Sequence, residues 1–279
     1  MSYKTILTVC TDADLIKSTL DHAAVIAGGH DAHLDVLCLG VDRTQTGYYY
    51  AGANAMVLQE TLARATSEAE ALAEAARDQL TRQDLRWSVE SGVAQLADIG
   101  RHVAMRARFA DLVVLPKPYG EGHGIELEPV IEGALFEGQV PVLVTPDDVT
   151  PKVAPQRILI GWNESSEALR AVRAAMPVLV QADAVHVVVI DPPKHGPNRS
   201  DPGGALSAWL ARHGVKAEID VLSRTMPRIS DVMQRHAVDV EADMVVMGAY
   251  GHSRFREAIL GGATRNMLEQ ARVPVLMAH

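Results

Sequence analysis

The chain has 279 residues, a length that suits two domains of ordinary size. Hydrophobic residues make up 48% and charged residues 22% of it, which is typical of a globular protein and excludes a long disordered one. Its net charge of −9 argues against nucleic acid as a partner, because nucleic-acid affinity rests largely on Lys and Arg at phosphates. No apolar run reaches the roughly 18 residues of a membrane span and no secretory signal pattern is present, so we expect no membrane partner and a cytoplasmic location.

Apolar strand patterns alternate with helical patterns in the first half of the chain. A helical face runs from Leu58 to Leu80, where apolar residues recur every three or four positions. Before it, Tyr48-Tyr49-Tyr50 is predicted to lie in an insertion around 47–62, where the tyrosines either bind a partner or pack on the helix. The strands predicted here are 4–10, 34–40, 85–90, 111–115 and 141–145.

The second half follows the same alternation. Continuous apolar runs such as 185–190 are typical of strands buried on both faces of a parallel sheet. Helical faces are predicted over 229–240 and 263–271. The strands predicted here are 157–162, 185–190, 216–222, 243–247 and 274–278.

The two halves are an internal repeat, because three blocks recur in the same order: 6–9 as 158–161, 110–115 as 242–247, and 140–144 as 273–277. Strand–helix alternation implies right-handed crossovers. We therefore predict an α/β fold of two doubly wound, mostly parallel five-stranded sheets in tandem. The predicted domains are 1–146 and 156–279, joined by a proline-rich linker.

In such sheets ligands bind outside the carboxyl ends of the strands. After the fourth strand of the second half, Gly248 and Gly251 allow a ligand close to the backbone. Gly261 and Gly262 then open a helix whose free N–H groups favour an anion. Thr264 in its first turn offers a hydroxyl, and positive charge comes from His252, Arg254 and Arg256. The pattern is that of a phosphate cradle, or of a plain turn and helix start.

The spacing Gly248-x2-Gly251-x9-Gly261 resembles the nucleotide-binding motif of the universal stress protein family. Residues 157–161 and 273–276 also resemble strands of that family, so the resemblance covers nearly the whole chain. It implies a tandem universal stress protein with an adenine-nucleotide alpha-hydrolase-like fold. Its second domain would bind ATP with Mg²⁺ as a sensor or switch, with at most slow hydrolysis. The family also implies a homodimer, or an internal pseudo-dimer of the two copies.

Two positions depart from the family's ATP-binding pattern. Gly262 stands where ATP binders carry Ser or Thr, although Thr264 matches a second hydroxyl position. Asn163 stands where an Asp meets the adenine; it could bond the adenine edge or lie in the N-cap region of a helix that Ser165 or Ser166 could also cap. The predicted binding residues are Gly161, Asn163, Gly248, Gly251, His252, Arg254, Gly261, Gly262, Ala263 and Thr264.

The first copy has lost this pattern, since Glu128, Pro129 and Ile131 align with Gly261, Gly262 and Thr264. Carboxylates at a helix start repel phosphate, so we predict a degenerate site there. The alternative for the whole chain is a nucleotide-free scaffold that acts through dimerisation or partner binding. A third alternative is a pocket for another small anion.

Other chemistry receives little support from the sequence. Cys10 and Cys38 are too few for a disulfide framework and are predicted to be buried, unreactive thiols on neighbouring strands. His30 and His33 lack further ligands for zinc, and His186 is predicted to be a core residue of its strand. We therefore predict no metal site and no catalytic residue.

Overall fold

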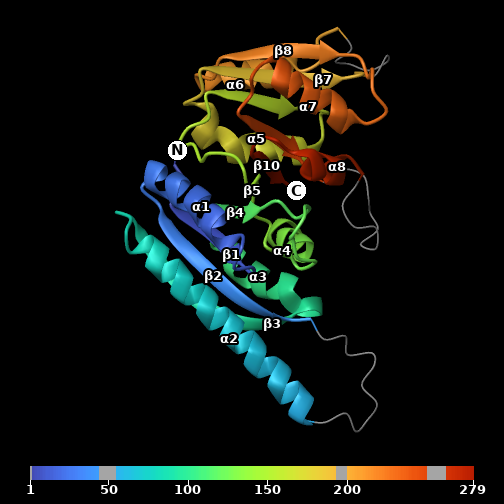
Figure 1. Ribbon diagram of the computed structural model, residues 1–279. Coiled ribbons are helices and arrows are strands. Elements are labelled where there is room, and N and C mark those ends of the chain that lie inside the picture. Colours follow the sequence, from blue (N-terminus) through green and yellow to red (C-terminus); the bar gives the residue numbers. More distant parts are fainter. Residues whose placement is uncertain (1, 44–54, 193–199, 250–261) are drawn as a thin grey trace. The chain divides into compact units, whose positions relative to one another are not determined.

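Strands form where the sequence has its continuous apolar runs, and helices connect them (Figure 1). The computed structural model describes residues 2–43, 55–192, 200–249 and 262–279. The chain divides into two units, Tyr3–Val140 and Pro141–His279. Each has a mainly parallel sheet, so the predicted α/β fold class is confirmed. The domain limits 1–146 and 156–279 stay a prediction.

The unit Tyr3–Val140 contains a parallel sheet with the order β3-β2-β1-β4. Its strands are β1 (Thr5–Cys10), β2 (His33–Asp42), β3 (Arg86–Gln95) and β4 (Leu112–Pro116). Its helices are α1 (Ile16–His30), α2 (Ala55–Leu80), α3 (Ile99–Ala107) and α4 (Leu127–Glu132), with a 3₁₀ turn over Leu96–Asp98 and a π-helical turn over Gly133–Glu137. Cys10 and Cys38 are buried and lie opposite each other in β1 and β2, as predicted.

Helix α2 confirms the long helical pattern but does not bury all of its apolar face. Leu72, Ala76 and Leu80 are buried, whereas Leu62 is 53% exposed. At about 1.5 Å per residue, the 26 residues of α2 span about 39 Å, but the 10 residues of β2 span only about 33 Å. The early turns of α2 therefore project beyond the strands, as Figure 1 shows.

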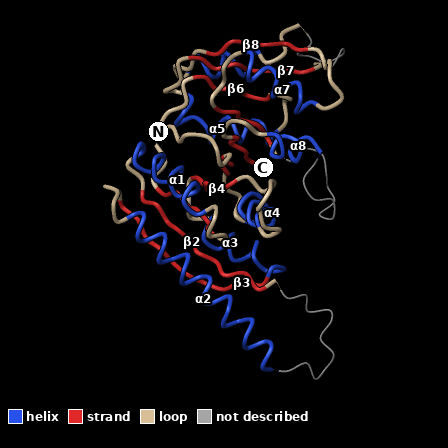
Figure 2. Tube along the Cα trace, in the orientation of Figure 1, coloured by secondary structure: helices blue, strands red, loops and turns tan. Residues whose placement is uncertain are grey.

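The unit Pro141–His279 contains a sheet with the order β5-β10-β9-β6-β7-β8. Its strands are β5 (Val142–Thr145), β6 (Arg157–Gly161), β7 (Ala184–Ile190), β8 (Ala217–Leu222), β9 (Met244–Gly248) and β10 (Val275–Ala278). Its helices are α5 (Ser166–Leu179), α6 (Gly204–Arg212), α7 (Ile229–Asp239) and α8 (Gly262–Gln270); Figure 2 shows helices and strands alternating along the trace.

Strand β5 occurs where the sequence predicts the strand 141–145. Within the unit Pro141–His279 it pairs antiparallel with β10, so that Val144 lies opposite Val275. The remaining neighbours, β6 to β10, are all parallel. Without this pairing, β10 would be an edge strand with backbone N–H and C=O groups that lack hydrogen-bond partners. The apolar pattern of the sequence does not show which strand pairs with β10.

The central strands are buried on both faces, as their continuous apolar runs predict. Ile6, Leu34 and Leu112 are fully buried in one unit, and Ile158, Leu159 and Ile160 in the other. Among the described residues, no helix combines the length and the apolar character needed to cross a membrane.

Candidate functional site

The carboxyl ends of β6 and β9 mark the switch point of the sheet in the unit Pro141–His279. The chain leaves β6 towards β7 on one side and later returns to β9 on the other side of β6. In open α/β sheets this arrangement places a crevice at the carboxyl ends of the two strands. Gly161 ends β6 and lies opposite Met247, one residue before Gly248 at the end of β9.

Gly248 is needed for the packing of β9 against α5. A Cβ atom at Gly248 would lie 2.5 Å from the backbone nitrogen of Ala168 and 2.8 Å from the carbonyl carbon of Glu167. At Gly161 a Cβ would meet the Cε of Met233 at 2.6 Å, the end of a side chain that can move. The start of α5 therefore lies directly against Gly248, and a contact between Gly248 and a ligand stays a prediction.

The loop after β6 is organised by two short side chains. The Oδ1 of Asn163 accepts a hydrogen bond from the backbone N–H of Ser165 at 3.2 Å, the turn that Asn side chains favour. The Oγ of Ser165 then accepts from the N–H of Ala168 at 3.1 Å and caps α5. Of the two serines that the sequence left open, Ser165 is the cap. Asn163 is exposed, so it lies at the surface of this loop.

A carboxylate and an imidazole, neither predicted from the sequence, flank the same edge of the sheet. A hydrogen bond from its own backbone N–H lowers the pKa of Glu167, and Ser165, Ser166 and His279 lower it further against the effect of desolvation. The Nδ1 of His279 lies 3.1 Å from the carbonyl oxygen of Ala249, just after β9. Glu167 therefore supplies negative charge at the start of α5.

Helix α8 begins at Gly262, which confirms the predicted helix start. Gly262 and Ala263 are exposed, and a Cβ at Gly262 would meet nothing within 4 Å. Thr264 is only 3% exposed and is therefore buried. Of the other predicted site residues, Gly251, His252, Arg254 and Gly261 lie outside the described residues, as do Tyr48–Tyr50.

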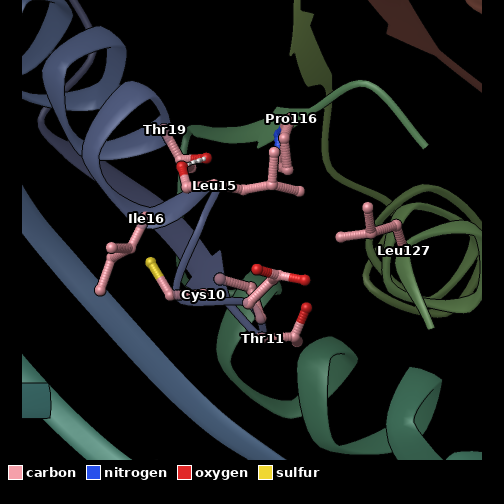
Figure 3. A pocket seen from close by; sticks show the side chains of 9 residues that line it. Cys10, Thr11, Leu15, Ile16, Thr19, Pro116 and Leu127 are labelled. Carbon is pink, nitrogen blue, oxygen red and sulfur yellow. Dashed lines mark hydrogen bonds between the residues drawn. The ribbon is translucent and has the colours of Figure 1, made fainter. Parts of the chain in front are cut away.

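The equivalent edge of the unit Tyr3–Val140 is largely filled. Figure 3 shows side chains that line a hollow at this edge. The hollow has no room for a water molecule, whereas ligand pockets begin at roughly 300 Å³. Its lining includes Cys10, Thr11, Leu15, Ile16, Thr19, Pro116 and Leu127. Aliphatic side chains share this lining with the carboxylate of Asp12 and the hydroxyls of Thr11 and Thr19.

An ion pair lies at the same edge. The Nη2 of Arg43, after β2, donates to the Oε1 of Glu126, before α4, at 2.6 Å. Glu126 is fully buried, and its hydrogen bond raises the pKa of Arg43 above the usual value for a guanidinium. The Oε2 of Glu126 has no hydrogen-bond partner among the described residues. A buried carboxylate with one cation beside it is unfavourable for a phosphate.

Comparison with known proteins finds a family match for the second half of the chain. Residues 155–279 match the model of the "Universal stress protein family". A curated universal stress protein of Synechocystis (strain PCC 6803) is 25% identical over 173 residues, which are 60% of this chain and 57% of that protein. The match therefore spans little more than half the length of that relative.

Solved structures share the fold. A universal stress protein from Archaeoglobus fulgidus matches with a TM-score of 0.74 at 15% identity, over 98% of this chain and 95% of that one. A universal stress protein solved in complex with cAMP matches with a TM-score of 0.34 at 20% identity, over 45% of this chain and 98% of that one. The first of these shows a shared fold over nearly the whole chain.

Proposed function

We propose that the second copy of the chain, where residues 155–279 match the model of the universal stress protein family, binds an adenine nucleotide. The proposed ligand is ATP with Mg²⁺, and the proposed role is that of a sensor or switch in a stress response. Nucleotide occupancy would bias a conformation or a partner surface.

The observation that carries this proposal is the position of the two residues that flank the glycine-spaced segment of the sequence. Gly248 ends β9 at the switch point between β6 and β9, and the exposed Gly262 begins α8. A loop of this kind followed by a helix N-terminus favours a phosphate. The basic residues His252 and Arg254 belong to the same loop in the sequence and would add charge for the phosphates. Gly251, Gly261, Ala263 and Thr264 complete the proposed phosphate contacts.

The adenine would lie near Gly161 and Asn163, after β6. Asn163 is exposed and uses its Oδ1 for the turn to Ser165, so we assign the adenine contact to its amide nitrogen, which is a donor. Glu167, the carboxylate at this edge, has a lowered pKa and is therefore a weak base. We propose that Mg²⁺ is held mostly by the phosphates and that hydrolysis is at most slow.

The alternative is a nucleotide-free scaffold that acts through dimerisation or partner binding. Two observations favour it: Thr264 is buried, and the Oδ1 of Asn163 is used for a hydrogen bond within its own loop. We retain it as the second candidate, together with a cytoplasmic location and a homodimer or internal pseudo-dimer as proposed properties.

The test is to denature freshly purified protein, identify the released small molecules by mass spectrometry, and titrate the same batch with ATP and Mg²⁺ by calorimetry. We expect co-purified adenine nucleotide, or binding with a Kd in the micromolar range. Gly251→Asp and Gly261→Glu should abolish it, because each puts a carboxylate where phosphate would bind.

The matched control is Gly28→Asp, at an exposed glycine of α1 where a Cβ would meet nothing within 4 Å. It should bind as the wild-type protein does. Absence of nucleotide and of binding heat at millimolar ATP would reject the proposal and favour the scaffold. Pull-down experiments with Tyr48–Tyr50 deleted would then test partner binding.

A further inference from the structure

Two histidines and one aspartate converge on a single point in the unit Pro141–His279. His186 comes from β7, Asp220 from β8 and His236 from the last turn of α7. The Nδ1 of His186 lies 2.9 Å and the Nε2 of His236 lies 2.8 Å from the same oxygen, Oδ2 of Asp220. The sequence predicted an apolar core position for His186, but its side chain takes part in this polar cluster.

The strand register explains how the cluster forms. His186 lies opposite Glu218 on β8, and Asp220 is two residues further along the same strand. Because side chains two residues apart share a face of a sheet, His186 and Asp220 are diagonal neighbours on one face. His236 reaches this face from α7, at a ring-centroid distance of 6.3 Å from His186 and nearly perpendicular to it.

The donor atoms are close to the geometry of a metal site. The three ligand atoms all lie within 4.8 Å of one another. With Zn–N and Zn–O bonds of about 2.0–2.2 Å, tetrahedral ligand atoms stand about 3.4 Å apart. The two contacts to Asp220 are therefore about half an ångström too short, a difference that small side-chain rotations remove. Each imidazole would then carry its proton on the other ring nitrogen.

Donor chemistry and burial select the class of ion. Two imidazoles and one carboxylate suit Zn²⁺ and similar transition-metal ions, whereas Mg²⁺ and Ca²⁺ prefer oxygen ligands. The side chains of His186, Asp220 and His236 are 15%, 24% and 17% exposed, so the cluster is largely desolvated but still accessible to an ion. In the part of the chain that the structure describes, no other group of three potential ligands is drawn together in this way.

We propose that His186, Asp220 and His236 form a binding site for one divalent transition-metal ion of the Zn²⁺ class, with water in the fourth position. Three ligands with an open position are the composition of an accessible zinc site rather than of a closed structural one. The site would tie α7 to the strands β7 and β8, and it shares no residue with the proposed nucleotide site.

The experiment is a calorimetric titration of the full chain with Zn²⁺, repeated for His186→Gln, Asp220→Asn and His236→Gln. We expect one ion bound by these residues with a Kd in the micromolar range or tighter, and a rise in Tm when Zn²⁺ is added. Each substitution should weaken binding at least tenfold and remove the rise in Tm. His213→Gln, at an exposed histidine of the same unit, is the matched control and should bind as the wild type.

Titration with Co²⁺ gives a readout that needs no variant, because a four-coordinate Co²⁺ ion with these ligands absorbs visible light far more strongly than the hydrated ion. Absence of this absorption together with no heat at about 100 μM Zn²⁺ would overturn the proposal. So would equal Zn²⁺ affinity in the wild type and the folded His186→Gln/His236→Gln double variant, since the ion would then bind elsewhere.

Discussion

At the scale of single residues, two positions in the structure depend on the size or the charge of the residue that occupies them. Gly248 packs so closely against the backbone of α5 that a Cβ atom would not fit between them. His30 is 6% exposed, packs edge-on against Tyr3 at 4.8 Å, and its Nε2 has no hydrogen-bond partner among the described residues. Both positions lead to measurable consequences.

Gly248→Ala should destabilise the unit Pro141–His279, because the added Cβ would lie 2.5 Å from the backbone nitrogen of Ala168. We expect a loss of about 1–3 kcal/mol in the free energy of unfolding, measured by urea denaturation. The matched change Gly28→Ala, inside α1 with open space beside it, should instead stabilise by about 0.5–1 kcal/mol. Equal effects of the two substitutions would contradict the close contact at Gly248.

The buried imidazole of His30 should make stability depend on pH. Burial, with a smaller contribution from Lys4, lowers the pKa of His30 below the usual value. The unfolded chain, with a pKa near about 6.5, then binds more protons as the pH falls. Stability is full above that pH and is lost as the pH drops towards the folded pKa. His30→Phe should reduce the loss seen between about pH 7.5 and 5.5 in urea denaturation; an unchanged loss would refute this assignment.

At the scale of elements, the two units use the carboxyl ends of equivalent strands differently. In Pro141–His279 the ends of β6 and β9 lead into a capped helix and an exposed helix start. In Tyr3–Val140 the edge near β1 and β4 holds aliphatic side chains and the pair of Arg43 with Glu126. The two units share one strand order but differ in the side chains at this edge, and for that reason we propose a nucleotide site in Pro141–His279 and none in Tyr3–Val140.

Arg43→Ala should destabilise the unit Tyr3–Val140 by leaving the fully buried Glu126 without its cation. A broken buried pair costs about 3–5 kcal/mol, and because Arg43 is 44% exposed we expect less, about 1–3 kcal/mol. Arg64→Ala removes an exposed pair with Glu68 and should cost less than about 0.5 kcal/mol. The free energy of unfolding of both variants is measured by chemical denaturation. The double variant Arg43→Ala/Glu126→Gln should recover part of the stability that Arg43→Ala loses. No recovery would argue against the unpaired buried charge as the cause.

At the scale of the whole molecule, two copies of one fold differ in chemistry, and we expect one nucleotide per chain. Saturating ATP with Mg²⁺ at about 100 times its Kd should stabilise the folded state by about 2.7 kcal/mol. Calorimetry gives the stoichiometry and denaturation gives the stabilisation. Two bound nucleotides per chain would mean that the first copy also has an open site.

Much of the fold could be predicted from the sequence for a simple physical reason. Parallel strands that are buried on both faces are apolar at most positions, so runs such as 185–190 identify them without knowledge of the neighbouring strands. The internal repeat supports these assignments, because matching blocks recur in the same order in both halves of the chain. All ten predicted strands are present, and α2, α7 and α8 occur where their periodicity placed them.

The site was less predictable, since hydrogen bonds and contacts depend on neighbours that are distant in the sequence. Ser165 rather than Ser166 caps α5 because of the turn that Asn163 makes. Gly248 lies against α5 and Thr264 is buried, and the spacing of these residues in the sequence shows neither contact.

The sequence by itself thus determined the α/β class, the tandem repeat and the family resemblance, because these depend on local apolar patterns and on short motifs. Only the tertiary structure decided that β5 pairs with β10, that Arg43 lies beside Glu126, and that His186, Asp220 and His236 meet. The cluster joins residues 34 and 16 positions apart, a spacing that no local rule links. Strand register and helix placement bring such groups together, and both arise only when the chain packs.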